Sequence, residues 1–219
     1  MLYLYAFVPH QAGAVETTGI GEIRPTVVPL GTVAAVVADV EGAIDSREEH
    51  VLAHARVVDA LAASNDAVLP VRFGRGFRDV DDLEQAVSRI LPELEERLED
   101  VKGCVELGLH VVAAPQPTAA ASSGREYMQR RLRDLSHAEA LAEEIYGPLA
   151  ARARAATRTH GVGASALLRA AYLLPETHVA AFRAAVEEGQ RAHPELAFAC
   201  TGPWPPYSFA ALEPEEAVA

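Results

Sequence analysis

Two histidines in one predicted helix have a spacing that could support metal chemistry. His50 and His54 are four residues apart, which can direct two imidazoles at one zinc ion. However, Glu49 precedes the pair, so the order is not His-Glu-x-x-His, and no third ligand lies nearby in the sequence. We therefore interpret both residues as histidines at the border of an apolar helix face, with a metal or small-molecule site as the alternative.

A glycine-punctuated loop is the second candidate. Gly74-Arg75-Gly76 follows an apolar run and precedes a helix, a position from which backbone amides can hold phosphate. The loop lacks the third glycine of a dinucleotide fingerprint and the Gly-Lys-Ser/Thr of a P-loop. The helix that follows begins with Asp79-Val-Asp-Asp82, whose carboxylates would repel phosphate. We expect a structural turn, and a small-molecule or nucleotide-binding loop at Gly74–Gly76 is the alternative.

Candidate nucleophiles are weak. There is no Gly-x-Ser-x-Gly sequence, and Cys104 and Cys200 lie in apolar runs that raise the pKa of a thiol. On these residues alone the sequence nominates no active site, so we predict no catalytic residues, no cofactor and no metal.

The segment from Thr201 to Phe209 is the most distinctive part of the chain. Its sequence, Thr-Gly-Pro-Trp-Pro-Pro-Tyr-Ser-Phe, holds three prolines in four positions, which predicts that a strand ends and an extended, stiff arm begins. The arm carries the single tryptophan, Trp204, together with Tyr207 and Phe209. We expect it to pack on its own protein and tie the domains together, and presentation to another protein is the alternative.

Hydrophobic periodicity indicates the elements that must position these residues. It predicts strands at residues 2–8, 26–30, 33–38, 67–72, 105–113, 167–174 and 196–201, and helices from Asp45 or Ser46 to about Ser64, at 81–101, at 125–158 and at 175–192. In the first helix, Val51, Ala55, Val58 and Ala62 define the expected apolar face. Hairpins mixed with crossover helices predict an α+β fold. The uncharged segment 114–124 is the expected linker between domains 1–118 and 119–219.

Composition narrows the class of protein. The chain has 219 residues, half of them hydrophobic, and a net charge of −12, so it can bury a core and is a poor partner for nucleic acid. Its longest apolar stretch without a charge, residues 26–38, is shorter than the ~20 residues that span a bilayer, so we expect no membrane segment. Two cysteines are too few for a disulfide framework and indicate the cytoplasm.

Several strings of residues together resemble the gas vesicle protein F/L family (GvpF/GvpL) over nearly the whole chain. They are Leu2-Tyr-Leu-Tyr-Ala6, His54-Ala-Arg-Val-Val-Asp-Ala-Leu61, Val68-Leu-Pro-Val-Arg-Phe-Gly74, Gly124-Arg-Glu-Tyr127, Ala170-Ala-Tyr-Leu-Leu174 and the segment from Thr201 to Phe209. The resemblance is to the family as a whole and does not separate its F and L members.

The resemblance implies a cytoplasmic, non-enzymatic accessory protein of gas vesicle assembly, and so of cell buoyancy. It implies two α+β domains, the second ferredoxin-like, with a C-terminal tail that packs back towards the first. The implied partners are the hydrophobic shell protein (GvpA-type) and other accessory proteins, with this protein acting as an assembly factor or a minor structural component of the vesicle. The motif positions expected to serve the fold or an interface are Arg72, Phe73, Gly74, Arg125, Tyr127, Trp204, Pro205, Pro206, Tyr207 and Phe209.

Overall fold

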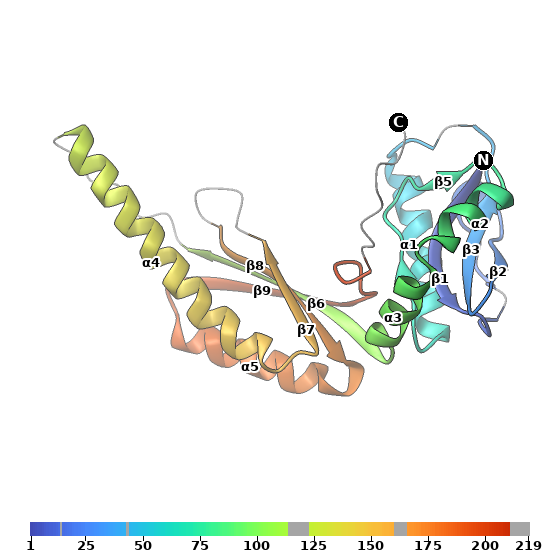
Figure 1. The fold of residues 1–219 in the computed structure, drawn as a ribbon. Helices are drawn as coiled ribbons and strands as arrows, with labels where there is room; N and C mark the ends of the chain where they lie inside the picture. The colour runs from blue at the N-terminus through green and yellow to red at the C-terminus, as the bar shows by residue number, and fades with distance from the viewer. Residues whose placement is uncertain (14, 43, 114–122, 160–165, 211–219) are drawn as a thin grey trace. The chain divides into compact units, whose positions relative to one another are not determined.

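The computed structural model describes the chain in two compact units. It describes residues 1–13, 15–42, 44–113, 123–159 and 166–210. Contacts between Cα atoms group Met1–Val105 with Trp204–Ala219, and Glu106–Pro203 separately. Each unit combines a sheet with helices, which confirms the predicted α+β class (Figure 1).

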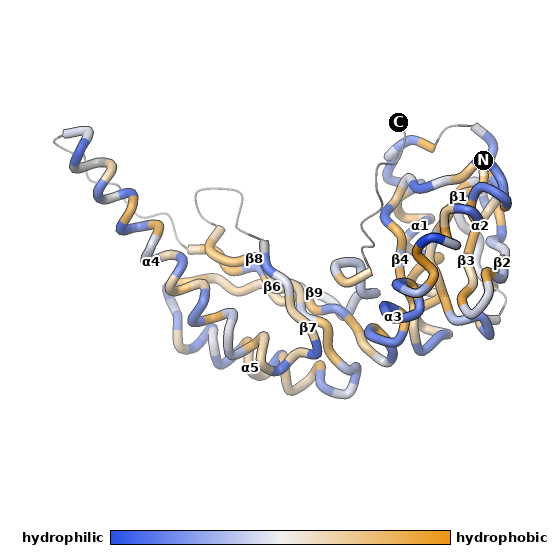
Figure 2. The backbone as a smooth tube through the Cα atoms, viewed as in Figure 1, coloured by the Kyte–Doolittle hydropathy of each residue, from blue (hydrophilic) through white to orange (hydrophobic). Residues whose placement is uncertain are grey.

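The first unit is organised around strand β1 (Leu2–Pro9). The sheet has the order β2-β3-β1-β4, with β2 at Thr26–Leu30, β3 at Val33–Asp39 and β4 at Leu69–Pro70, and β5 (Gly76–Phe77) also pairs with β1. Both β1 and β3 are buried along almost their whole length, as expected for strands that are apolar on both faces. Figure 2 shows the matching run of hydrophobic residues along these two strands.

A bulge in β1 decides which of its side chains share a face. The register with β3 shifts between Leu4 and Ala6, and the extra residue reverses the alternation of side chains. As a result Tyr3, Tyr5, Ala6 and Val8 belong to one core cluster, although strict alternation would separate the odd from the even positions.

Helix α1 (Glu48–Ser64) covers that face of β1 through a set of residues that differs from the prediction. Its buried residues are Ala53, His54, Val57, Val58 and Leu61, whereas Val51 and Ala62 are exposed. The buried face of α1 is wider than the predicted apolar face, because Ala53, Val57 and Leu61 form a second row, spaced every four residues, next to the predicted one. The helix also begins later than the predicted Asp45 or Ser46: Arg47 is the N-cap residue, and Asp45 pairs with Arg47 and His50.

Two further helices belong to the first unit. The expected helix at 81–101 is divided into α2 (Val80–Ser88) and α3 (Leu91–Val101). Pro92 lies in the first turn of α3, where backbone N–H groups have no acceptor within the helix, so the lack of an N–H in proline costs no hydrogen bond. A short 3₁₀ turn, η1 (Ile20–Glu22), lies between β1 and β2.

The second unit follows the order β-α-β-β-α-β, which is that of a ferredoxin-like motif. Its elements are β6 (Cys104–Ala113), α4 (Gly124–Ala150), β7 (Ala155–Thr159), β8 (Ala166–Pro175), the short η2 (Glu176–His178), α5 (Val179–Ala192) and β9 (Leu196–Trp204), and the sheet order is β7-β8-β6-β9.

Two predictions for this unit differ from the structure. Residues 105–113 form a strand as predicted, but β6 pairs within the second sheet, so the contacts divide the chain near residue 105 rather than at 118. Residues 151–158 are predicted as helix, but α4 ends at Ala150 and β7 pairs antiparallel with β8. In this second segment long-range pairing has overridden local propensity.

Two buried tyrosines provide a test of this packing. The Tyr5 hydroxyl accepts a hydrogen bond from the Ile20 amide at 2.9 Å. The Tyr172 hydroxyl is also buried, but among the described residues none forms a hydrogen bond with it. Tyr5→Phe should therefore destabilise the protein by about 1–3 kcal/mol, because it leaves a buried N–H unpaired, whereas Tyr172→Phe should leave stability unchanged or raise it by up to about 1 kcal/mol. Urea unfolding of the two variants measures both changes, and equal losses would contradict this packing.

Candidate interaction site around Tyr3 and the C-terminal tail

The hydroxyl of Tyr3 links two parts of the first unit that are far apart in the sequence. It lies 2.8 Å from Nδ1 of His54 on α1, and it accepts a hydrogen bond from the amide of Gly74 at 3.2 Å. The phenol oxygen can accept from Gly74 and still donate its proton to Nδ1 of a neutral His54. The direction of the bond between Tyr3 and His54 depends on which ring nitrogen of the imidazole carries the proton.

Aromatic rings enclose this hydrogen-bonded group. The ring of Tyr5 stacks on His54 with centroids 5.4 Å apart, and Phe73 meets His54 edge-on at 5.9 Å. Tyr3 meets Tyr5 edge-on at 4.9 Å. We call Tyr3, Tyr5, His54, Phe73 and Gly74 the Tyr3 cluster.

Burial controls the titration of the cluster. Removal from water lowers the pKa of His54 to about 4, and a hydrogen bond with the backbone of Val71 offsets only part of this shift. Burial likewise raises the pKa of Tyr3 and of Tyr5 above the ordinary value for a tyrosine, although each hydroxyl accepts a backbone hydrogen bond. The cluster is therefore uncharged at neutral pH.

Backbone hydrogen bonds hold the glycine loop against β1. The Val71 amide donates to the carbonyl of Tyr5 at 2.9 Å, and the Leu4 amide donates to the carbonyl of Arg75 at 3.0 Å. Gly74 has a φ of +93°, a conformation that favours glycine, and this conformation accompanies the contact between its amide and Tyr3.

This arrangement does not favour the nucleotide-binding alternative. The Gly74 amide is directed at Tyr3 instead of outward. At the start of α2, the Asp79 carboxylate accepts from the Asp82 amide at 2.8 Å, and Asp82 pairs with Arg78 at 2.9 Å. The groups that would hold a phosphate therefore already have internal partners or face negative charge.

The C-terminal tail is partly packed and partly exposed. Strand β9 continues to Trp204, three residues beyond the predicted end, and residues 207–209 form a turn in which the amides of Phe209 and Ala210 both donate to the carbonyl of Pro206. Pro205 and Pro206 are buried, whereas Trp204 is 51% exposed.

Tyr207 connects the tail to the Tyr3 cluster. Burial raises the pKa of Tyr207 to about 12, with a smaller contribution from the nearby Asp59 on α1. Tyr207 in turn contributes to the raised pKa of Tyr3, after burial and the charge of Tyr5. The tail therefore lies near the same part of the first unit as the loop that carries Phe73 and Gly74.

The structure brings together some of the predicted positions and separates others. Phe73, Gly74, Pro205, Pro206, Tyr207 and the half-buried Phe209 all belong to the first unit, while Arg72 and Trp204 are exposed there. Arg125 and Tyr127 belong to α4 in the second unit, where Arg125 is exposed and the side chain of Tyr127 lies outside the described structure.

The two histidines considered as metal ligands have separate surroundings. His54 is 3% exposed within the Tyr3 cluster, so its interpretation as a border residue is wrong, whereas His50 contacts Asp45 at 3.0 Å near the surface. Across the described ranges, no group of three or more His, Cys, Asp or Glu residues is placed to hold a metal ion. Sequence reasoning missed Tyr3, Tyr5 and His54 as one cluster, although the spacing of His54 with Val57, Val58 and Leu61 was a usable signal.

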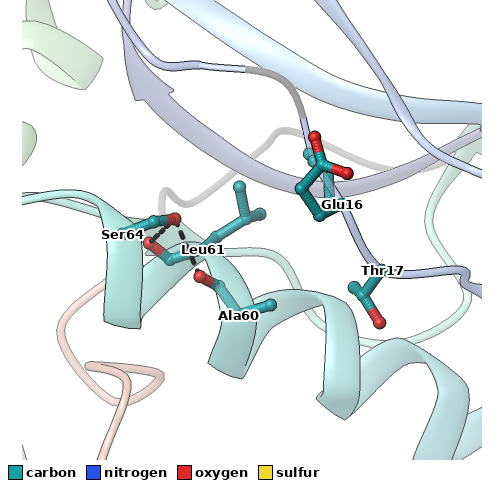
Figure 3. Close-up of a pocket in the computed structure, with 6 residues that line it drawn as sticks. Glu16, Thr17, Ala60, Leu61 and Ser64 are labelled. Atoms are coloured by element: carbon teal, nitrogen blue, oxygen red, sulfur yellow. Dashed lines mark hydrogen bonds between the residues drawn. The ribbon is translucent and has the colours of Figure 1, made fainter.

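One small pocket lies beside the end of α1 (Figure 3). It has a volume of about 380 Å³ and is lined by Val15, Glu16, Thr17, Ala60, Leu61 and Ser64. The Ser64 hydroxyl donates to the Ala60 carbonyl at 2.8 Å, and Glu16 pairs with Arg24 at 3.8 Å. Two of its polar groups therefore already have partners within the protein.

No helix among the described residues has the length and hydropathy needed to cross a membrane.

Comparison with known proteins gives one consistent result. Residues 1–211 match the model of the family described as gas vesicle synthesis protein GvpL/GvpF. The chain is 27% identical over 213 residues to gas vesicle protein F2 of Halobacterium salinarum, covering 95% of this chain and 91% of that protein. It is 32% identical over 192 residues to gas vesicle protein L of a Streptomyces species, and the match covers 75% of this chain and 70% of that protein.

Solved structures share the fold. The crystal structure of gas vesicle protein GvpF from Anabaena sp. PCC7120 superposes with a TM-score of 0.86 at 16% identity, covering 100% of this chain and 99% of that one. The GvpF structure from Microcystis aeruginosa gives a TM-score of 0.81 at 17% identity, covering 96% and 99%.

The buried His54 predicts a specific pH dependence of stability. Its pKa is about 4 in the folded protein and about 6.5 in the unfolded chain, so between these values the unfolded state binds more protons. Stability should therefore fall as pH drops from 6.5 to 4, by on the order of 3 kcal/mol from this residue, and should change little further through it below pH 4.

Chemical denaturation from pH 4.5 to 7 measures this slope. His54→Gln should flatten it, whereas His10→Gln, at an exposed histidine, should leave it as in the wild type. Identical slopes in the His54 variant and the wild type would show that the imidazole is not held neutral by burial.

Proposed function

The chain belongs to the GvpL/GvpF family of gas vesicle synthesis proteins, and from that premise we propose that it binds the hydrophobic shell protein during vesicle assembly. A role in gas vesicle formation follows from the family and from relatives named as gas vesicle proteins F and L. The proposal adds three points to that role: the shell protein as the partner, a non-enzymatic mode of action, and a binding surface at the C-terminal tail.

The single observation that carries the proposal is the exposure of Trp204. About half of its side-chain surface is accessible, and the next two residues, Pro205 and Pro206, are buried in the first unit. An aromatic ring beside a fixed backbone loses little conformational entropy on docking, and tryptophan is enriched among the residues that dominate binding energy. Trp204 is therefore a suitable anchor for an apolar partner.

The charge of the chain supports the same role. With a net charge of −12, the protein would keep a complex with a strongly apolar partner soluble through electrostatic repulsion. Helix α3 illustrates how this charge is arranged, because Leu94 and Leu98 are buried while Glu93, Glu95, Glu96 and Glu99 alternate around them. Cys104 and Cys200 form no disulfide in the part of the chain that the structure describes, which is compatible with the cytoplasm as the place of action.

Truncation of Trp204 tests the proposal. In cells that co-express the shell protein, Trp204→Ala should reduce the shell protein that co-purifies with this chain by at least about 10-fold, which is the effect of losing a central aromatic anchor. Its free energy of unfolding should change by less than about 2 kcal/mol, because half the ring is already in water.

The matched control is Leu52→Ala on α1, where the leucine is 54% exposed and no binding role is assigned. It should retain the shell protein as the wild type does. If the wild type retains no shell protein, the proposal is wrong; if Trp204→Ala retains as much as the wild type, the tail is not the binding surface.

A further inference from the structure

The first four turns of α4 carry an apolar stripe that the described residues of this unit do not cover. Met128, Leu132 and Leu135 are spaced four and three residues apart, so they lie on one side of the helix. They are 58%, 60% and 55% exposed. Every side chain described between residues 123 and 137 is exposed, and Figure 1 shows this half of α4 extending beyond the strands of its own unit.

The exposed stripe is in line with a second apolar stripe, which is buried, in the C-terminal half of the same helix. Met128, Leu135, Ala142 and Leu149 are each seven residues apart, the repeat with which helices pack against one another in coiled coils. Ala142 and Leu149 belong to the core of the second unit and are each 5% exposed. The helix therefore presents one packing face along its length, and only its second half packs within this unit.

An uncovered stripe of this kind indicates an interaction surface. Helical stability in proteins comes mainly from packing of the apolar face, and a segment of this length is marginal on its own in water. Contiguous exposed apolar side chains on a folded domain are typical of protein interaction sites. Figure 2 shows hydrophobic and hydrophilic residues alternating along this half of α4, as on an amphipathic helix.

The charge beside the stripe identifies the chemistry of its partner. Residues 124–137 contain four arginines and only two acidic residues, a net charge of +2 in a chain of net charge −12. Arg131 lies three residues after Met128 and four before Leu135, and Arg125 lies seven residues before Leu132, so both border the stripe and both are exposed. An acidic surface complements this border.

A second copy of this chain does not provide that surface. Pairing the stripe with itself would place arginines beside arginines. The acidic helix α3 has its leucines, Leu94 and Leu98, buried in the first unit and so offers no free apolar stripe of its own.

We propose that the first half of α4 docks an amphipathic helix of a different protein, one with an apolar stripe and acidic residues on its flanks. The two helices pair over the 14 residues from 124 to 137, a length of about 21 Å. This site is formed by the second unit alone and does not include Trp204. Helix docking and shell-protein binding can therefore be tested separately.

Two designed helical peptides test the proposal with the full-length protein. Both have leucine at the heptad core positions; one has glutamate and the other lysine at the flanking positions. The glutamate peptide should bind the wild-type protein at least about 10-fold more tightly than the lysine peptide, measured by fluorescence anisotropy at low salt. The double variant Arg125→Glu/Arg131→Glu should reverse this preference.

Variants of the apolar stripe provide a second test of the proposal. Met128→Gln/Leu132→Gln/Leu135→Gln should weaken binding of the glutamate peptide at least about 10-fold with an unchanged thermal unfolding midpoint, because these side chains are already exposed. The control Val51→Gln/Leu52→Gln, on the exposed apolar pair of α1, should bind like the wild type.

Several results would overturn the proposal. These are no binding of the glutamate peptide to the folded protein, equal binding of both peptides, or binding that the stripe variant does not weaken. A dimer of the protein in light scattering that the stripe variant dissolves would assign the stripe to a second copy instead.

Discussion

The requirement that every buried tyrosine hydroxyl of β1 find a partner underlies the arrangement of the first unit. Tyr3 and Tyr5 lie on the face of β1 that α1 covers, and the bulge after Leu4 adds Ala6 and Val8 to that face. Their hydroxyls then meet the amides of Gly74 and Ile20, while Tyr3 also reaches His54. One strand therefore positions a helix, a 3₁₀ turn and the glycine loop. The tail lies near the same region, since Tyr207 contributes to the raised pKa of Tyr3.

Much of the fold could be predicted from the sequence because its signals are local. The alternating or wholly apolar runs of β1 and β3 and the glycine and proline boundaries of the helices place most elements within a few residues. The wrong predictions concern segments whose structure depends on pairing with residues that are distant in the sequence. β6 has the same apolar pattern whichever sheet it joins, and residues 155–159 become a strand because β8 offers a paired edge.

The candidate site was less accessible to sequence reasoning for the same reason. Tyr3 meets His54 and Gly74 across separations of 51 and 71 residues, and no local pattern records such contacts. The prolines correctly marked the tail as unusual. Which of its rings faces water depends on surfaces contributed by α1 and β1, so the exposure of Trp204 beside two buried prolines emerges only from the folded chain.

We propose that the first unit contacts the shell protein through its tail and the adjoining loop. Hydrogen–deuterium exchange of the full chain, alone and in complex with co-expressed shell protein, measures where this contact lies. On complex formation, slower exchange is expected at the amides of residues 72–76, Trp204 and 207–210, where loop and tail adjoin the Tyr3 cluster, whereas Pro205 and Pro206 have no amide proton to report. Slower exchange confined to residues 106–203, with these amides unchanged, would contradict it.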